Sequence, residues 1–245
     1  MKNNWFFDKI IGIDIAYDMR RDSDERDPDK HSTVLKNYHK KSRSKKLPNG
    51  DFFELNDDIK NIYLHHKSKL GEYFLSSDSI IHTYSMRKRM SHIIEIIPKE
   101  EINIFKNLSY TIGCFILFPS NKVNNLSTIN QERGVNPKIC DRIDLTLEYI
   151  RLYYINEDSP LKTTLLRYND YFKLFTNFKG YCEFFFLQDL TSNDYWKVKF
   201  FLPFNGFENS PLPKSVNEYL EYRNNNISFV SNRNKRIEKI SKNTM

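Results

Sequence analysis

The sequence predicts an α+β fold that is predominantly helical, with a small β element inside one compact domain. Residues 136–155 carry apolar side chains at steps of three and four, as one face of a helix does. Residues 110–119 form a short apolar run with β-branched and aromatic side chains, which favours a strand. Residues 1–56 show no regular apolar period. We therefore expect a single domain over 1–245, with an irregular, extended basic arm over 1–56 that packs on or beside a mainly helical body over 57–245.

Local signals define the other expected elements. Asn136 suits the cap of the 136–155 helix, and Pro137 suits its first turn. Further helices are expected where apolar residues recur at helical spacing, over 57–73, 79–97, 159–175, 180–190 and 228–242. The apolar stretches 5–18 and 196–204 are additional candidate strands.

The charge balance favours a polyanionic partner. The chain has a net charge of +7 and a pI of about 9.1, so nucleic acid is the expected class of ligand. No GxxxxGK[ST], GxGxxG or GxSxG motif occurs, which excludes the common phosphate-loop and dinucleotide enzymes. The three cysteines lack metal-ligand spacing, and no apolar run is long enough to span a bilayer. These features predict a cytoplasmic protein with no membrane partner and no favoured cofactor.

Three carboxylates lie on the polar face of the 136–155 helix. Asp141, Asp144 and Glu148 share one sector of the helical wheel, and carboxylate oxygens at that spacing suit a hard divalent cation such as Mg²⁺. A metal ion there would serve phosphodiester cleavage. The alternative is a solvated helix face on which Glu148 pairs with Arg151. Mg²⁺ is therefore an open possibility, and a site without metal is favoured.

Basic side chains form two candidate nucleic-acid-binding regions. The first surrounds the 136–155 helix and offers cations that match phosphate oxygens: Arg133, Lys138, Arg142 and Arg151. Internal ion pairs with neighbouring carboxylates are the alternative use of these arginines. The second region is the basic arm, where Tyr38 accompanies five cations: Lys40, Lys41, Arg43, Lys45 and Lys46. A solvated arm with no ligand is the alternative there.

Histidine supplies the candidate acid–base groups at neutral pH. His39 lies in the basic arm and His82 in a polar segment, so either is a candidate base for the 2′-hydroxyl proton in a metal-free ribonuclease. Arg142 completes this candidate catalytic set, because a cation stabilises the phosphorane. His66 falls on the apolar stripe of the expected 57–73 helix and is expected in the core.

Several stretches of the sequence carry a resemblance to a known family. Among them are DPDK, LPNG, SSDSIIHTYS, YTIG-FI-FP, INQ-RG-NPKI-DR-DLTLE and FKGY-FF-LQDL. Over roughly residues 14–236 the chain resembles an uncharacterised family of bacterial proteins with a domain of unknown function. It is also similar to lactococcal abortive infection proteins of the AbiB type. Arg43 stands where the uncharacterised family usually has tryptophan. The resemblance implies one domain in which the basic arm belongs to the fold.

The combined expectation is an RNA-binding protein that acts as an endoribonuclease in bacterial phage defence. The similarity to abortive infection proteins implies attack on RNA and a phage-encoded trigger, while the net positive charge suits a polyanionic substrate. The alternative is a non-catalytic regulatory module that binds nucleic acid or an acidic protein. A third possibility is a small-molecule enzyme whose pocket is lined by some of the 19 Phe and 15 Tyr.

Overall fold

An antiparallel sheet forms between residues 56 and 119 of the computed structural model, which describes residues 12–24, 26–58, 63–208 and 210–243. In sheet order its strands are β3 (Asn56–Asp57), β4 (Leu64–Ser68), β5 (Gly71–Ser79) and β6 (Phe115–Pro119). All five residues of β6 are buried, as expected for the apolar stretch 110–119. The strand prediction there is confirmed, although it covers only the second half of the stretch.

The β4–β5 hairpin lies where a helix was expected over 57–73, and that prediction was wrong. Leu64 and His66, two residues apart in β4, are both buried, as the period of a half-buried strand requires. In so short a stretch the apolar positions fit a period of two as well as 3.6. Gly71 follows the turn with a φ of +151°, a backbone conformation that favours glycine. The part over 59–62 lies outside the described residues.

The N-terminal segment packs against the body as expected, but it contains short helices, so the prediction of an extended conformation was wrong. Its elements are η2 (Met19–Asp22), α1 (Pro28–His31), α2 (Thr33–Arg43) and a two-stranded sheet of β1 (Lys45–Lys46) and β2 (Phe52–Phe53). Ser32 caps α2 by accepting a hydrogen bond from the Leu35 backbone N–H at 2.9 Å. No strand forms over 12–18, and 5–11 lie outside the described residues. The arm therefore contributes to the core, as the family resemblance implied.

Short helices replace the long one expected over 79–97. The segment holds η3 (Lys88–Met90) and α3 (Ser91–Ile94), and α4 (Lys99–Leu108) follows. The chain before η3 is irregular, and Tyr84 there takes a left-handed φ of +57°. Pro98 separates α3 from α4 because it cannot continue a helix. A short η4 (Ile112–Cys114) then leads into β6.

The helices expected from 136 onward form, but with different boundaries. They are preceded by α5 (Ile129–Val135), and comprise α6 (Ile143–Tyr154), α7 (Lys162–Arg167), α8 (Asn169–Lys173), α9 (Phe178–Phe185) and η5 (Gln188–Leu190). Asn136 ends α5 instead of beginning α6. Cys140 and Asp141 take left-handed φ angles of +48° and +62°, so a helix cannot continue through them. The predicted 159–175 helix is divided at Tyr168 between α7 and α8.

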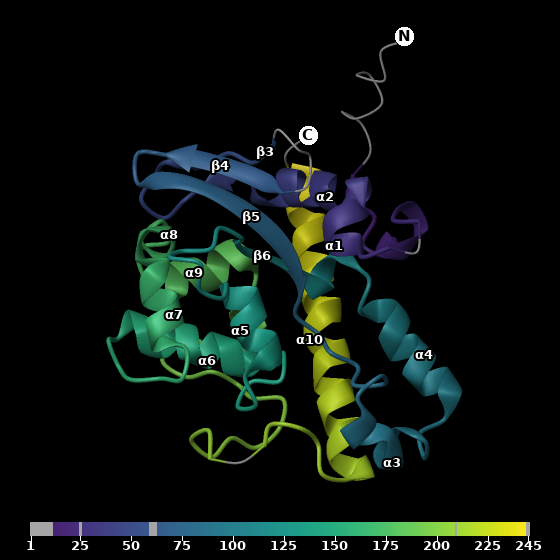
Figure 1. The fold of residues 1–245 in the computed structure, drawn as a ribbon. Helices are drawn as coiled ribbons and strands as arrows, with labels where there is room; N and C mark the ends of the chain where they lie inside the picture. Colours follow the sequence, from purple (N-terminus) through teal and green to yellow (C-terminus); the bar gives the residue numbers. More distant parts are fainter. Residues whose placement is uncertain (1–11, 25, 59–62, 209, 244–245) are drawn as a thin grey trace, which may run out of the picture.

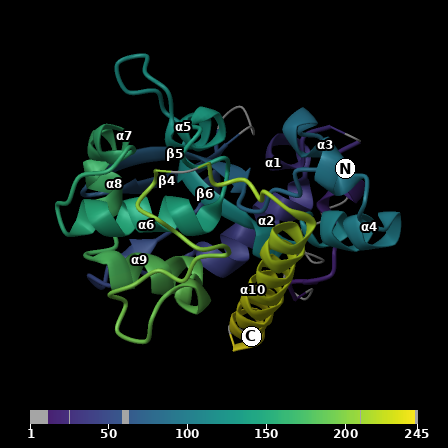
Figure 2. The ribbon, with the colours of Figure 1, turned by 90° about the horizontal axis from the view of Figure 1, so that it is seen from below.

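The C-terminal helix α10 (Val216–Asn243) confirms the helix predicted over 228–242 and extends it toward the N-terminus. It runs through the middle of the molecule, with α3 and α4 on one side and the sheet and α5–α9 on the other (Figure 1, Figure 2). The strand expected over 196–204 was wrong. The segment has one isolated bridge, between Thr191 and Val198, and the backbone N–H of Phe201 donates to Asp144 at 2.8 Å.

One hydrophobic cluster joins these elements, from the N-terminal segment to α10. Aromatic rings dominate it around α8 and α9, where Phe175 lies 5.3 Å from Tyr171, Tyr181 and Phe185, measured between ring centroids. The α+β class and the single compact domain are thereby confirmed. Within the parts that the structure describes, no helix has the length and apolarity needed to cross a membrane.

Candidate active site

A pocket of about 660 Å³ opens where α1, the end of β5 and α4 come together. We call it the acidic pocket, because four of its lining residues are aspartates: Asp27, Asp29, Asp78 and Asp141. Arg26 and Lys106 also line it and bring positive charge to the same space. A smaller hollow of about 320 Å³ shares Asp27, Asp29 and Asp78 with the acidic pocket. These three shared carboxylates therefore lie between two accessible spaces.

Local sequence places two of these aspartates, Asp29 and Asp78, in the lining of the same pocket. Asp27 caps α1 by accepting a hydrogen bond from the Asp29 backbone N–H at 3.1 Å, and Pro28 begins the helix. This short helix packs against β5, whose last two residues are Asp78 and Ser79. The Asp-Pro-Asp sequence and the end of a strand thus bring Asp29 and Asp78 to the same pocket.

Asp29 has the properties of a general acid at neutral pH. Its Oδ1 is buried and has no hydrogen-bond partner among the described residues. Burial raises the pKa of this carboxyl to about 8, the negative charge of Asp78 raises it further, and a hydrogen bond from Ser77 opposes the rise. Asp29 is therefore mostly protonated at pH 7 and can donate its proton.

Asp78 has the opposite protonation state. Its carboxylate pairs with the guanidinium of Arg133, and about a quarter of its side chain is exposed. Burial raises the pKa of Asp78 to about 6, although the charge of Arg133 lowers it. At pH 7 Asp78 is mostly ionised while Asp29 is mostly neutral. Of two carboxyls with pKa values on either side of neutrality, the protonated one can act as the general acid and the ionised one as the general base.

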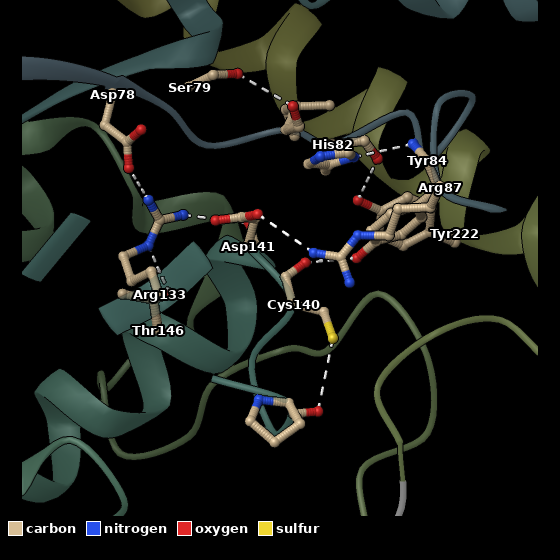
Figure 3. A network of polar contacts seen from close by, with 12 residues as sticks. Asp78, Ser79, His82, Tyr84, Arg87, Arg133, Cys140, Asp141, Thr146 and Tyr222 are labelled. Atoms are coloured by element: carbon tan, nitrogen blue, oxygen red, sulfur yellow. Dashed lines mark hydrogen bonds and ion pairs between the residues drawn. The ribbon is translucent and has the colours of Figure 1, made fainter. Parts of the chain in front are cut away.

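A row of charges with alternating sign lies beside the pocket, from Asp78 through Arg133 and Asp141 to Arg87 (Figure 3). Arg133 is fully buried, and its Nε donates to Thr146 Oγ1 at 2.9 Å while its Nη2 donates to the Asp141 carbonyl oxygen at 3.2 Å. Arg87 lies 3.6 Å from the Asp141 carboxylate. Arg133 thus orients Asp78 and is enclosed within the protein instead of being displayed to a phosphate.

Three of the non-glycine residues with left-handed backbone conformation belong to the same network. Tyr84, Cys140 and Asp141 all take left-handed φ angles, of +57°, +48° and +62°. The Tyr84 hydroxyl donates to the Cys140 carbonyl oxygen at 2.9 Å and links the strained segments (Figure 3). Non-glycine residues in this conformation cost about 1–3 kcal/mol each and cluster at functional sites. The strain supports a functional role for the acidic pocket.

His82 lines the acidic pocket, as a candidate acid–base residue should. Its Nδ1 accepts a hydrogen bond from the Tyr84 backbone N–H at 3.0 Å, so the neutral ring carries its proton on Nε2. Burial lowers the pKa of His82, and the charge of Asp141 opposes that shift. A neutral His82 can donate a hydrogen bond to a ligand through Nε2.

His39, the second candidate histidine, is fully buried on α2. Its Nε2 lies 3.0 Å from Ser77 Oγ, so it reaches the carboxylates only through that hydroxyl. Burial lowers the pKa of His39 well below its usual value, and the charges of Arg43 and Arg233 lower it further. A histidine held neutral in this way is a poor proton acceptor, and its contact with Ser77 fixes the position of the serine.

The basic arm presents only part of its charge to solvent. Arg43 is fully buried and donates from Nη1 to the Phe184 carbonyl oxygen at 2.9 Å. The Lys45 Nζ lies 4.1 Å from the centre of the Phe186 ring, and burial lowers the pKa of this lysine to about 7. Lys40 pairs with a carboxylate of β3 at 2.8 Å. Lys41 and Lys46 are the exposed members of the set.

The three carboxylates predicted as metal ligands do not converge. Asp144 is fully buried against Arg142, and Glu148 Oε1 lies 2.7 Å from Nη2 of Arg151, while Asp141 lies before α6. Arg142 is 3 % exposed and also donates to the Pro211 carbonyl oxygen at 2.9 Å. Among the described parts of the chain, no group of three or more His, Cys, Asp or Glu side chains is placed to hold a metal ion. Internal ion pairing, the alternative use of these arginines, is what the structure shows.

Sequence reasoning missed Asp29 and Asp78. Nothing in helical or strand spacing links them, since they lie on separate elements. The available signal was their place in the stretches DPDK and SSDSIIHTYS, which both carry the family resemblance. Of the predicted cations, Lys138 is exposed and lines two pockets beside the site.

Comparisons with known proteins identify a family without an assigned activity. The family of unknown function DUF6994 matches residues 13–237, which is most of the chain. No curated protein matches the chain, and no solved structure matches it. The resemblance to an uncharacterised family is therefore confirmed, and the similarity to abortive infection proteins has no support from these comparisons.

Proposed function

The chain belongs to the DUF6994 family, and we propose that it is an RNA-binding endoribonuclease in which Asp29 and Asp78 perform acid–base catalysis without a metal ion. The observation that carries this proposal is the pair of carboxyls in one pocket, with pKa values of about 8 and about 6. Groups with pKa values near the operating pH are the most effective proton donors and acceptors. A role in phage defence in the cytoplasm, with a phage-encoded trigger, is part of the proposal and rests on the resemblance to abortive infection proteins.

The proposed reaction is a transesterification within the RNA strand. The Asp78 carboxylate takes the proton of a 2′-hydroxyl, and the 2′-oxygen attacks the adjacent phosphorus. The bond from phosphorus to the 5′-oxygen breaks, and Asp29 gives its proton to that oxygen. The products are a 2′,3′-cyclic phosphate and a 5′-hydroxyl end. Arg26 and Lys106 line the pocket and oppose the charge that develops on the phosphorane.

Other predicted residues take different roles in this proposal. His82 can donate a hydrogen bond from Nε2 to a phosphate oxygen, because it lines the same pocket. His39 and Arg142 act on the fold instead, because both are buried and bonded within the protein.

The second candidate function is a non-catalytic nucleic-acid-binding module. Exposed cations outside the acidic pocket favour it, among them Lys46 and Lys138. Such a module would bind RNA in a salt-dependent way and leave the strand intact.

The test uses end-labelled single-stranded RNA with EDTA present, over a range of salt concentrations. We expect cleavage to cyclic phosphate ends, and its loss by at least about a hundredfold in Asp29→Asn and in Asp78→Asn. Asp158→Asn is the matched control, since that side chain is exposed and lines neither the acidic pocket nor the hollow beside it. Salt-sensitive binding without cleavage would favour the binding module. Cleavage only with added magnesium, or release of free bases, would refute the proposed reaction.

A further inference from the structure

A second pocket, of about 490 Å³, lies on the other side of the strained segment at Cys140 and Asp141. Asp141 lines the acidic pocket, while its neighbour Cys140 lines this second one. We call the second space the basic pocket, because three cations line it against one carboxylate: Arg87, Arg89 and Lys138 against Glu208. The two pockets thus adjoin neighbouring residues of one chain segment, with an excess of carboxylates in the first and of cations in the second.

Arg87 connects the two pockets electrostatically. It lines the basic pocket and lies 3.6 Å from the Asp141 carboxylate, which lines the acidic one. That distance is an ion pair longer than a hydrogen bond. Its guanidinium lies 5.5 Å from the centre of the Tyr84 ring, which restricts its movement. Arg87 is therefore held in place and keeps hydrogen-bond donors for a ligand.

The other two cations are available to a ligand. Arg89 and Lys138 are exposed, and neither forms an ion pair with a carboxylate in the described ranges. The turn that carries Lys138 is fixed, because its backbone N–H donates to Asn136 Oδ1 at 2.9 Å. In contrast to Arg133 and Arg142, which are enclosed with carboxylates, these side chains present their charge to an open pocket.

We infer that the basic pocket binds a backbone phosphate of a single-stranded nucleic acid, next to the nucleotide held in the acidic pocket. This inference rests on the proposed function for the nature of its ligand. Guanidinium groups match phosphate oxygens through paired hydrogen bonds, and the lysine adds a point charge. Arg87 lines the basic pocket and pairs with Asp141 of the acidic pocket, so it sets the register of the strand, and a phosphate bound by Arg89 and Lys138 places its neighbour beside Asp78.

The test measures binding of a short fluorescein-labelled oligodeoxythymidine by anisotropy, over a series of salt concentrations. This strand lacks the 2′-hydroxyl, so the result does not depend on whether Asp29 and Asp78 cleave RNA. The variant is the double charge reversal Arg89→Glu/Lys138→Glu. The matched control is Lys197→Glu/Lys199→Glu, which changes the net charge equally at exposed residues that line neither pocket.

We expect the Arg89→Glu/Lys138→Glu protein to bind at least about tenfold more weakly at low salt. The slope of log Kd against log salt should fall by about 0.7, because the variant loses one phosphate contact and each contact contributes about 0.7 for a single strand. The control should bind as the unaltered protein does. Equal weakening in both variants, or unchanged binding in the first, would overturn the inference. Loss of binding together with an absence of RNA cleavage in the unaltered protein would retain the basic pocket and reject the proposed ribonuclease.

Discussion

Replacing Asp29 with asparagine should stabilise the fold at neutral pH while it removes the proposed activity. The unaltered side chain is partly buried, and desolvation raises the pKa of its carboxyl to about 8, against 3.8 for an exposed aspartate. At pH 7 the unfolded chain has this carboxyl ionised, and folding requires it to take up a proton. Asparagine has nearly the same shape and carries no charge, so it avoids that requirement.

The sign and the size follow from proton linkage. The native state binds more protons than the unfolded state between pH 3.8 and about 8, so the contribution of Asp29 to stability falls as the pH rises through this window. One pKa unit corresponds to about 1.36 kcal/mol. Between pH 5 and pH 7 the unaltered protein should therefore lose about 2.6 kcal/mol more of its unfolding free energy than Asp29→Asn does.

The assay is urea unfolding of both proteins at pH 5, 6 and 7. Asp78 titrates in both proteins, so the difference between them isolates Asp29. Asp158→Asn, at an exposed side chain, is the control for removing one carboxylate. Parallel pH dependence of the unaltered protein and Asp29→Asn would show that Asp29 is ionised in the native state. The assignment of Asp29 as the general acid would then be wrong.

Three further outcomes test the packing around the site. Arg142→Ala should lower the unfolding free energy, measured by urea unfolding, by about 3–5 kcal/mol, because it leaves the buried Asp144 without a counter-ion. The double variant Arg142→Met/Asp144→Leu should recover much of that loss. Equal unfolding free energies for the single and double variants would refute the pairing. Gly113→Ala should cost about 1–3 kcal/mol by the same measurement, since its new Cβ would lie 2.4 Å from a side-chain oxygen of α10. Gly134→Ala is its control, with no neighbour closer than 3.4 Å. The thiols of Cys114 and Cys182 should not react with a disulfide reagent until the protein unfolds, because both are fully buried and burial raises the pKa of Cys114 to about 12. Rapid labelling of either thiol in the folded protein would contradict this.

The sequence predictions were accurate for elements that depend on local interactions, and they failed for elements that depend on contacts between residues far apart in the chain. The α6 and α10 helices were predictable because an apolar stripe recurs over three or more turns within each. The β4–β5 hairpin was not, since a few apolar residues fit two periods equally well. The basic run of the N-terminal segment indicated exposure, yet Arg43 is buried and donates a hydrogen bond to the Phe184 carbonyl oxygen of α9, 141 residues away in the chain. The charge composition of a segment does not indicate which of its cationic side chains are buried and which are exposed to solvent.

The sequence by itself determined the helical character, the single aromatic-rich core, the net positive charge and membership of a family through its short stretches. Only the tertiary structure decided where the chemistry lies. Asp78 and Arg133 meet across 55 positions of the chain, and Asp29 meets them through the packing of α1 on β5. Their protonation states depend on burial and on neighbouring charges, which exist only after folding. Spacing along the chain records local geometry, whereas a pocket and its pKa values arise from contacts between distant elements.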